Sequence, residues 1–169
     1  MYRGTTLGPE VIEGYREAAR TGDPVVESGF TSTTSDPSAA FGGNTRFVIR
    51  SEHGKDVSPI SVFGTEQEVL FRAGTRFRVL SVTESAAGEH VIMLEGGPLT
   101  MRDRADDDQE ILRQLTEAAE EQARILADPA RAHPVPHPDK YADPIGFEEE
   151  GRPLPRRRRS DAAGDQAEP

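Results

Sequence analysis

Three β-prone runs in the first 98 residues constrain the fold of this chain more than any other feature of its sequence. They read RFVIR (Arg46–Arg50), RFRVLSV (Arg76–Val82) and HVIMLEG (His90–Gly96), and turns that contain Gly, Asp and Ser separate them. β-Branched and aromatic residues between such turns are typical of short strands. The sequence therefore predicts a small, sheet-rich domain that spans residues 1–98.

Two other segments have the spacing of amphipathic helices. The first runs from about Pro9 to about Arg20, with Pro9 in its first turn and Gly22 just past its end, as helix termini favour. We interpret its apolar stripe as core packing. The second runs from about Asp107 to about Ala127, and the acidic residues at its N-terminus suit the helix dipole.

The composition changes again after residue 127. Residues 128–169 are rich in Pro and in charged residues and contain few large apolar side chains, which predicts a disordered tail. We interpret Arg156–Arg159 as a solvated charge run, because acidic residues flank it. The chain thus divides into a domain over residues 1–98, an acidic linker and helix over residues 99–127, and this tail.

Composition also excludes several classes of protein. The absence of Cys excludes disulfides, a thiolate nucleophile and a zinc site built on sulfur. Prolines interleave His133 and His137, so these side chains predict no metal site either. A formal net charge of −10 argues against a nucleic-acid partner. No apolar run approaches the roughly 20 residues that span a bilayer, and the N-terminus lacks the regions of a secretory signal. We expect a soluble chain without a membrane partner.

Three short polar motifs stand out within the sheet-rich part. YRG (Tyr2–Gly4) places an arginine in the predicted first strand, followed by a glycine that allows close approach of a ligand. GFTSTTSD (Gly29–Asp36) carries a run of hydroxyl residues at a strand end. The third motif is Glu66-Gln67-Glu68. In a strand Glu66 and Glu68 would project from one face about 7 Å apart.

Each motif alone is commonly an exposed strand face or a turn. Two carboxylates on one face repel each other, so the arrangement costs stability unless a cation, a hydroxyl donor or a substrate compensates. Glu66 and Glu68 therefore favour a functional site over a purely structural role.

The three motifs occur in an order that resembles one enzyme family. With GKDVSPIS before the last motif and GTRFRVL after it, they resemble the Arg/Ser-Thr-Ser/Glu-x-Glu class of mono-ADP-ribosyltransferases, which includes bacterial ADP-ribosylating exotoxins. The resemblance covers about Tyr2 to Leu94. It implies an α+β fold with two packed, bent β-sheets around an NAD cleft and few helices. The family usually has a helical segment before the arginine strand, and we expect that part to be missing here.

The resemblance implies catalytic roles for three residues. Glu68 would bind the 2′-hydroxyl of the nicotinamide ribose, where a carboxylate strengthens its hold as positive charge develops on the sugar. Ser32 would support Glu68 by hydrogen bonding. Glu66 would engage the acceptor, since a second carboxylate can grip a guanidinium and accept its proton.

The resemblance also implies the residues that bind NAD. Arg3, followed by Gly4, would hold the phosphates with a planar fork that is always charged. Thr33 and Thr34 complete the hydroxyl motif, and Phe41 would stack on the nicotinamide.

The expected function is transfer of ADP-ribose from NAD to a protein side chain, expected to be arginine, with release of nicotinamide. NAD serves as a substrate, and no metal is required. The same residues leave two alternatives open: an NAD glycohydrolase with water as acceptor, or a truncated, inactive domain that acts as an interaction module. The chain would work in the cytoplasm or as a secreted effector exported by another route.

Overall fold

The three β-prone runs form the longest strands in the described part of the structure, which is a computed structural model. It describes residues 1–40, 42–61, 67–85, 88–96, 105–128, 130, 144–148 and 152–154. The runs lie in β4 (Thr45–Arg50), β7 (Arg76–Ser85) and β8 (Gly88–Gly96), which confirms all three predicted strands. The shorter strands are β1 (Tyr2–Thr5), β2 (Val25–Val26), β3 (Thr31–Thr34), β5 (Lys55–Asp56) and β6 (Glu68–Phe71).

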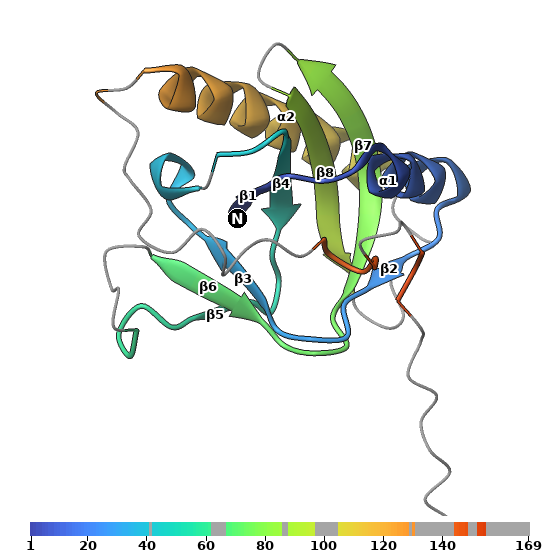
Figure 1. Ribbon diagram of the computed structural model, residues 1–169, viewed down its shortest axis with the longest axis horizontal. Helices are drawn as coiled ribbons and strands as arrows, with labels where there is room; N and C mark the ends of the chain where they lie inside the picture. Colours follow the sequence, from blue (N-terminus) through green and yellow to red (C-terminus); the bar gives the residue numbers. More distant parts are fainter. Residues whose placement is uncertain are drawn as a thin grey trace, which may run out of the picture.

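One hydrogen-bonded sheet contains all of these strands, in the order β2-β7-β8-β4-β1-β3-β6-β5. β4 and β8 run parallel, whereas the other neighbours are antiparallel. β1 and β3 share a single register pair, Tyr2 with Thr34, so the sheet changes direction there. In Figure 1 the β3, β6 and β5 strands cross the direction of β4, β8 and β7. The described strands form this single sheet in place of the two separate sheets expected: β2-β7-β8-β4 forms its larger part and β3-β6-β5 its smaller part, and β1 joins the two by pairing along both of its edges.

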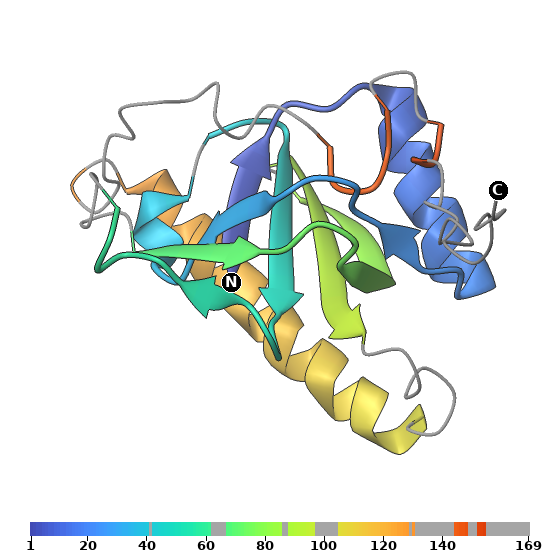
Figure 2. The ribbon, with the colours of Figure 1, turned by 90° about the horizontal axis from the view of Figure 1, so that it is seen from below.

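Two α-helices cover opposite faces of the larger part of the sheet (Figure 2). They are α1 (Pro9–Thr21) and α2 (Ala105–Ala127), which confirms both predicted helices, with α2 beginning two residues earlier than expected. Side chains alternate between the two faces of a strand. Phe47 of β4 accordingly joins the apolar core with Tyr15 of α1, and their rings meet edge to face with centroids 5.4 Å apart.

The helix ends follow the local chemistry of their residues. Gly22 takes the left-handed conformation, with φ +75°, and its N–H donates to the carbonyl of Ala18 at 2.9 Å, which closes α1. Near the start of α2, Asp108 forms a two-point ion pair with Arg78 of β7 and so ties the helix to the sheet. Within the described residues, neither α-helix is both long and apolar enough to cross a membrane.

The prediction of a disordered tail is wrong for residues 144–148 and 152–154, which pair with each other, and Ile145 and Phe147 of the first segment lie in the core. Ile145 is fully buried, and Phe147 is 5% exposed. The Phe147 ring packs edge to face on Tyr15 with centroids 4.7 Å apart, and the Tyr15 hydroxyl donates to the carbonyl of Ile145 at 2.7 Å. The composition of residues 128–169 as a whole does not reveal that Ile145 and Phe147 are buried. Their burial depends on Tyr15, which lies 130 positions before Ile145 in the chain. The other tail residues predicted to be disordered lie outside the described part, except Asp128 and Ala130.

Candidate active site

The structure brings three predicted site residues together on neighbouring strands. Arg3 lies on β1, Ser32 on β3 and Glu68 at the start of β6. The Ser32 hydroxyl donates to Oε1 of Glu68, which is the hydrogen bond expected from the resemblance. Nη1 of Arg3 donates to the carbonyl oxygen of Ser32 at 3.2 Å. Ser32 therefore contacts both charged side chains.

All three residues are buried, with exposed fractions of 5% for Arg3, 7% for Ser32 and 7% for Glu68. A carboxylate removed from water is costly unless hydrogen-bond donors satisfy it. The Ser32 hydroxyl supplies such a donor, and a hydrogen bond to a charged acceptor is about twice as strong as one between neutral groups. The orientation of Glu68 is thus set by β3 before any ligand arrives.

The other hydroxyls of the motif have different surroundings. Thr33 points to the opposite face from Ser32, and its hydroxyl donates to the carbonyl of Val69 at 2.8 Å. This contact braces the β3–β6 pair, which supports a structural role rather than the predicted contact with NAD. Thr34 is buried, and its hydroxyl accepts from the N–H of Asp36 at 3.0 Å.

Gln67 has an unusual backbone that the sequence does not reveal. It has φ +47°, in the left-handed region, which is uncommon for a residue other than glycine. The chain therefore turns at Gln67, and β6 begins only at Glu68. The prediction of one extended strand through Glu66 and Glu68 is wrong at this point. Such conformations gather at functional sites, where the surrounding structure holds them in place.

Ser35, the residue that follows β3, holds this turn in place. The N–H of Ser35 donates to the Gln67 carbonyl at 3.1 Å, and the Ser35 hydroxyl donates to the side-chain oxygen at 3.0 Å. Two predicted site residues, Glu66 and Phe41, lie outside the described residues. Gly4 is buried in β1, in register with Arg46 of β4.

Arg3 also lines a pocket of about 370 Å³. The remaining walls come from residues 27–31 and from the C-terminal hairpin, our name for residues 144–148 and 152–154. Burial raises the pKa of the nearby Tyr15 well above its usual range, and the positive charge of Arg3 opposes that rise. Sequence reasoning missed the pocket residues Glu27, Phe147 and Glu148, because nothing in their spacing relates them to Arg3.

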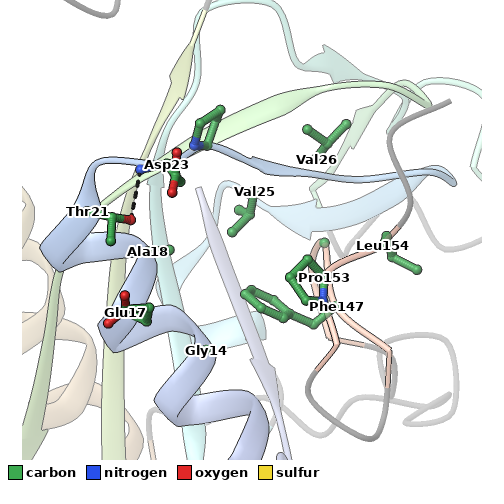
Figure 3. A pocket seen from close by; sticks show the side chains of 12 residues that line it. Gly14, Glu17, Ala18, Thr21, Asp23, Val25, Val26, Phe147, Pro153 and Leu154 are labelled. Atoms are coloured by element: carbon green, nitrogen blue, oxygen red, sulfur yellow. Dashed lines mark hydrogen bonds between the residues drawn. The ribbon is translucent and has the colours of Figure 1, made fainter. Parts of the chain in front are cut away.

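A larger pocket, of about 460 Å³, lies between α1, β2 and the C-terminal hairpin (Figure 3). Phe147, Val25 and Leu154 line it, and its acidic residues are Glu17 and Asp23. It contains none of the predicted site residues, whereas the smaller pocket contains Arg3. Among the described residues, no group of three or more His, Asp or Glu side chains is placed to hold a metal ion.

A sequence profile described as ADP-ribosyltransferase exoenzyme matches residues 10–100, more than half of the chain. The chain belongs to the ADP-ribosyltransferase exoenzyme family. The matched range includes Ser32 and Glu68, and Arg3 lies just before it.

Individual members of the ADP-ribosyltransferase family are also similar. Mav from Mycobacterium avium is 46% identical over 87 residues, which cover 49% of this chain and 10% of that protein. Tre1 from Pseudomonas putida, named NAD(+)–protein-arginine ADP-ribosyltransferase, is 35% identical over 94 residues, which cover 56% of this chain and 18% of that protein. The chain thus spans between a tenth and a fifth of the length of these curated relatives.

A solved structure shows the same fold. The ADP-ribosyltransferase HopU1 of Pseudomonas syringae superposes with a TM-score of 0.54 at 24% identity, over 56% of this chain and 44% of that one. The predicted α+β ADP-ribosyltransferase fold is therefore confirmed.

Proposed function

We propose that this chain transfers ADP-ribose from NAD to an arginine side chain of a protein and releases nicotinamide. The contact of Ser32 with both Glu68 and Arg3, in a member of the ADP-ribosyltransferase exoenzyme family, carries this proposal. The name of the relative Tre1 supports arginine as the acceptor. Because the family is one of exoenzymes, we place the acceptor protein outside the cell that makes the chain.

Glu68 acts on the bond that breaks. The bond between C1′ of the ribose and the nicotinamide nitrogen breaks, and nicotinamide leaves with the bonding electrons. Positive charge then develops on the ribose, as in glycoside cleavage. The Glu68 carboxylate, held by the Ser32 hydroxyl, hydrogen-bonds the 2′-hydroxyl and stabilises that charge. A preorganised group of this kind lowers the barrier because it need not reorient during the reaction.

Arg3 binds the phosphates of NAD. A guanidinium is charged at all working pH values and offers several donors in one plane, which suits phosphate oxygens. The bond from Nη1 to the Ser32 carbonyl fixes its direction relative to β3. One strand therefore positions both the group that holds the phosphates and the group that acts on the ribose.

Glu66 serves the acceptor. A nitrogen of the acceptor guanidinium attacks C1′, a new C–N bond forms, and the nitrogen loses a proton to the Glu66 carboxylate. This role rests on the sequence motif and on the position of Glu66 directly before the turn at Gln67.

The test separates cleavage of NAD from transfer. Purified chain is incubated with adenylate-labelled NAD and polyarginine, and both nicotinamide release and label on the polymer are measured. Wild type is compared with Glu66→Gln and with Glu84→Gln, a control at an exposed residue of β7. We expect wild type and the control to label the polymer, and Glu66→Gln to release nicotinamide without labelling it. Nicotinamide release without labelling by wild type would favour a glycohydrolase, and no release at all would favour the interaction module.

A further inference from the structure

The pocket beside Arg3 has a wall that comes from the far end of the chain. Phe147, Glu148 and Leu154 of the C-terminal hairpin line it, together with the loop that leads into β3. Its volume of about 370 Å³ falls within the ~300–1,000 Å³ of small-molecule sites. The pocket is therefore large enough for part of a dinucleotide.

Backbone hydrogen bonds and close packing hold this wall in place. The N–H of Leu154 donates to the carbonyl of Gly146 at 3.0 Å, so the two arms of the hairpin pair with each other. The N–H of Gly146 donates to Oε2 of Glu27 at 3.1 Å. Gly146 has φ +76°, and a Cβ there would lie 2.9 Å from Cβ of Val25, so β2 and the hairpin approach as closely as glycine allows. The wall is preformed.

The position of the pocket along β3 relates it to the rest of the site. Thr31, the first residue of β3, lines the pocket, and the Glu68 carboxylate accepts from the hydroxyl of Ser32, the next residue of the strand. Arg3 lines the pocket and also donates to the Ser32 carbonyl, so it links the pocket to Glu68. A molecule with its phosphates on Arg3 and one sugar at Glu68 would therefore extend its other half toward the pocket.

The chemistry of the lining suits a nucleoside. Phe30, 72% exposed, offers an aromatic face beside Phe147 and Leu154 of the hairpin, and apolar faces of this kind pack on flat bases. Two carboxylates, Glu27 and Glu148, also line the pocket. A carboxylate accepts hydrogen bonds from ribose hydroxyls and repels a phosphate on the same sugar.

Glu27 and Glu148 can each accept further hydrogen bonds from a ligand. Glu27 accepts one N–H on each oxygen, from Gly29 at 2.9 Å and from Gly146 at 3.1 Å. A carboxylate offers about four acceptor positions, so further acceptor positions remain. Glu148 pairs with Arg152 at 2.7 Å, and its side chain is 35% exposed, so it can meet solvent and ligand.

We propose that the C-terminal hairpin completes the NAD site: the pocket binds the adenosine half of NAD, and Glu27 and Glu148 select NAD against NADP, which carries a 2′-phosphate on that ribose. This inference rests on the proposed function. It also makes the hairpin part of the catalytic unit, which then comprises more than residues 1–98.

The experiment compares the two dinucleotides in the full chain. Binding of NAD and of NADP is measured by calorimetry, and nicotinamide release from each is measured in parallel, for wild type, Glu148→Gln, Leu154→Ala and the control Glu84→Gln. Wild type and the control should prefer NAD. In Glu148→Gln the ratio of the affinity for NAD to the affinity for NADP should fall on the order of tenfold, because one negative charge near the 2′-phosphate is gone. Leu154→Ala should weaken the binding of NAD and the binding of NADP by a similar factor.

The outcomes separate this inference from the proposed function. An equal affinity of wild type for NAD and NADP, or an unchanged preference in Glu148→Gln, would overturn the role of the hairpin even if NAD is cleaved. Selective binding of NAD that Glu148→Gln relaxes would support the pocket even if no transfer occurs, and the proposed function would then fail alone.

Discussion

The substitution Gly14→Ala should change the free energy of unfolding, and the sign of the change should depend on whether the Phe147 ring is present. Gly14 lies in the middle of α1, where alanine normally stabilises a helix by about 1 kcal/mol. A Cβ at Gly14 would lie 2.6 Å from Cε1 and 3.1 Å from Cζ of Phe147. The ring is buried and packed on Tyr15, so it cannot move away freely. Overpacking of this kind costs about 1–3 kcal/mol, and Gly14→Ala should therefore be neutral or destabilising by up to about 2 kcal/mol.

The Phe147→Ala background removes the obstacle. That variant alone should lose about 3–5 kcal/mol, the usual cost of deleting a buried phenylalanine ring. Adding Gly14→Ala to it should then recover about 1 kcal/mol, because only the helix propensity remains. Urea unfolding of the four proteins gives the coupling free energy between the two sites, expected at about 1–3 kcal/mol. Stabilisation of equal size by Gly14→Ala in both backgrounds would show that the hairpin does not pack on α1.

Two further predictions concern single side chains. Arg3→Ala should weaken NAD binding measured by calorimetry at least about tenfold, because the pocket loses its buried cation; wild-type affinity in this variant would refute the role of Arg3. Burial, aided by the charge of Arg46, lowers the pKa of His90 below its usual value. As pH falls below about 6.5, the unfolded chain gains a proton that the native chain resists, so stability should fall by up to about 1.4 kcal/mol per pH unit. Urea unfolding at several pH values should show that the free energy of unfolding changes less steeply with pH in His90→Gln than in wild type. Identical slopes for the two proteins would contradict the role of His90.

Local sequence pattern was sufficient for much of the fold. The β-branched and aromatic runs in β4, β7 and β8, and the apolar stripe of α1 with Gly22 after its end, are properties of short segments of sequence. The approach of Ser32 to Glu68 was also predictable, because the order of the motifs resembled a known family.

The remaining features depend on contacts between distant segments. Phe147 can be buried because α1 has Gly14 where the ring needs space. The two residues are too far apart in the sequence for a local pattern to relate them. The left-handed turn at Gln67 depends on Ser35, which lies 32 positions earlier. Glu27 joins the loop before β3 to Gly146, 119 positions later. Such pairings are set by the tertiary structure, which can override local propensity.

Nicotinamide release from NAD tests the central claim most directly, since it requires Glu68 and no acceptor protein. Wild type, Glu68→Gln, Ser32→Ala and the exposed control Glu84→Gln are compared at saturating NAD. We expect Glu84→Gln to match wild type and Glu68→Gln to lose about 10²–10³-fold in kcat, as for removal of a single electrostatic stabiliser. The kcat of Ser32→Ala should lie between the values for wild type and Glu68→Gln, because this variant keeps the Glu68 carboxylate and loses the hydroxyl that orients it. Release by Glu68→Gln at the wild-type rate would contradict the account.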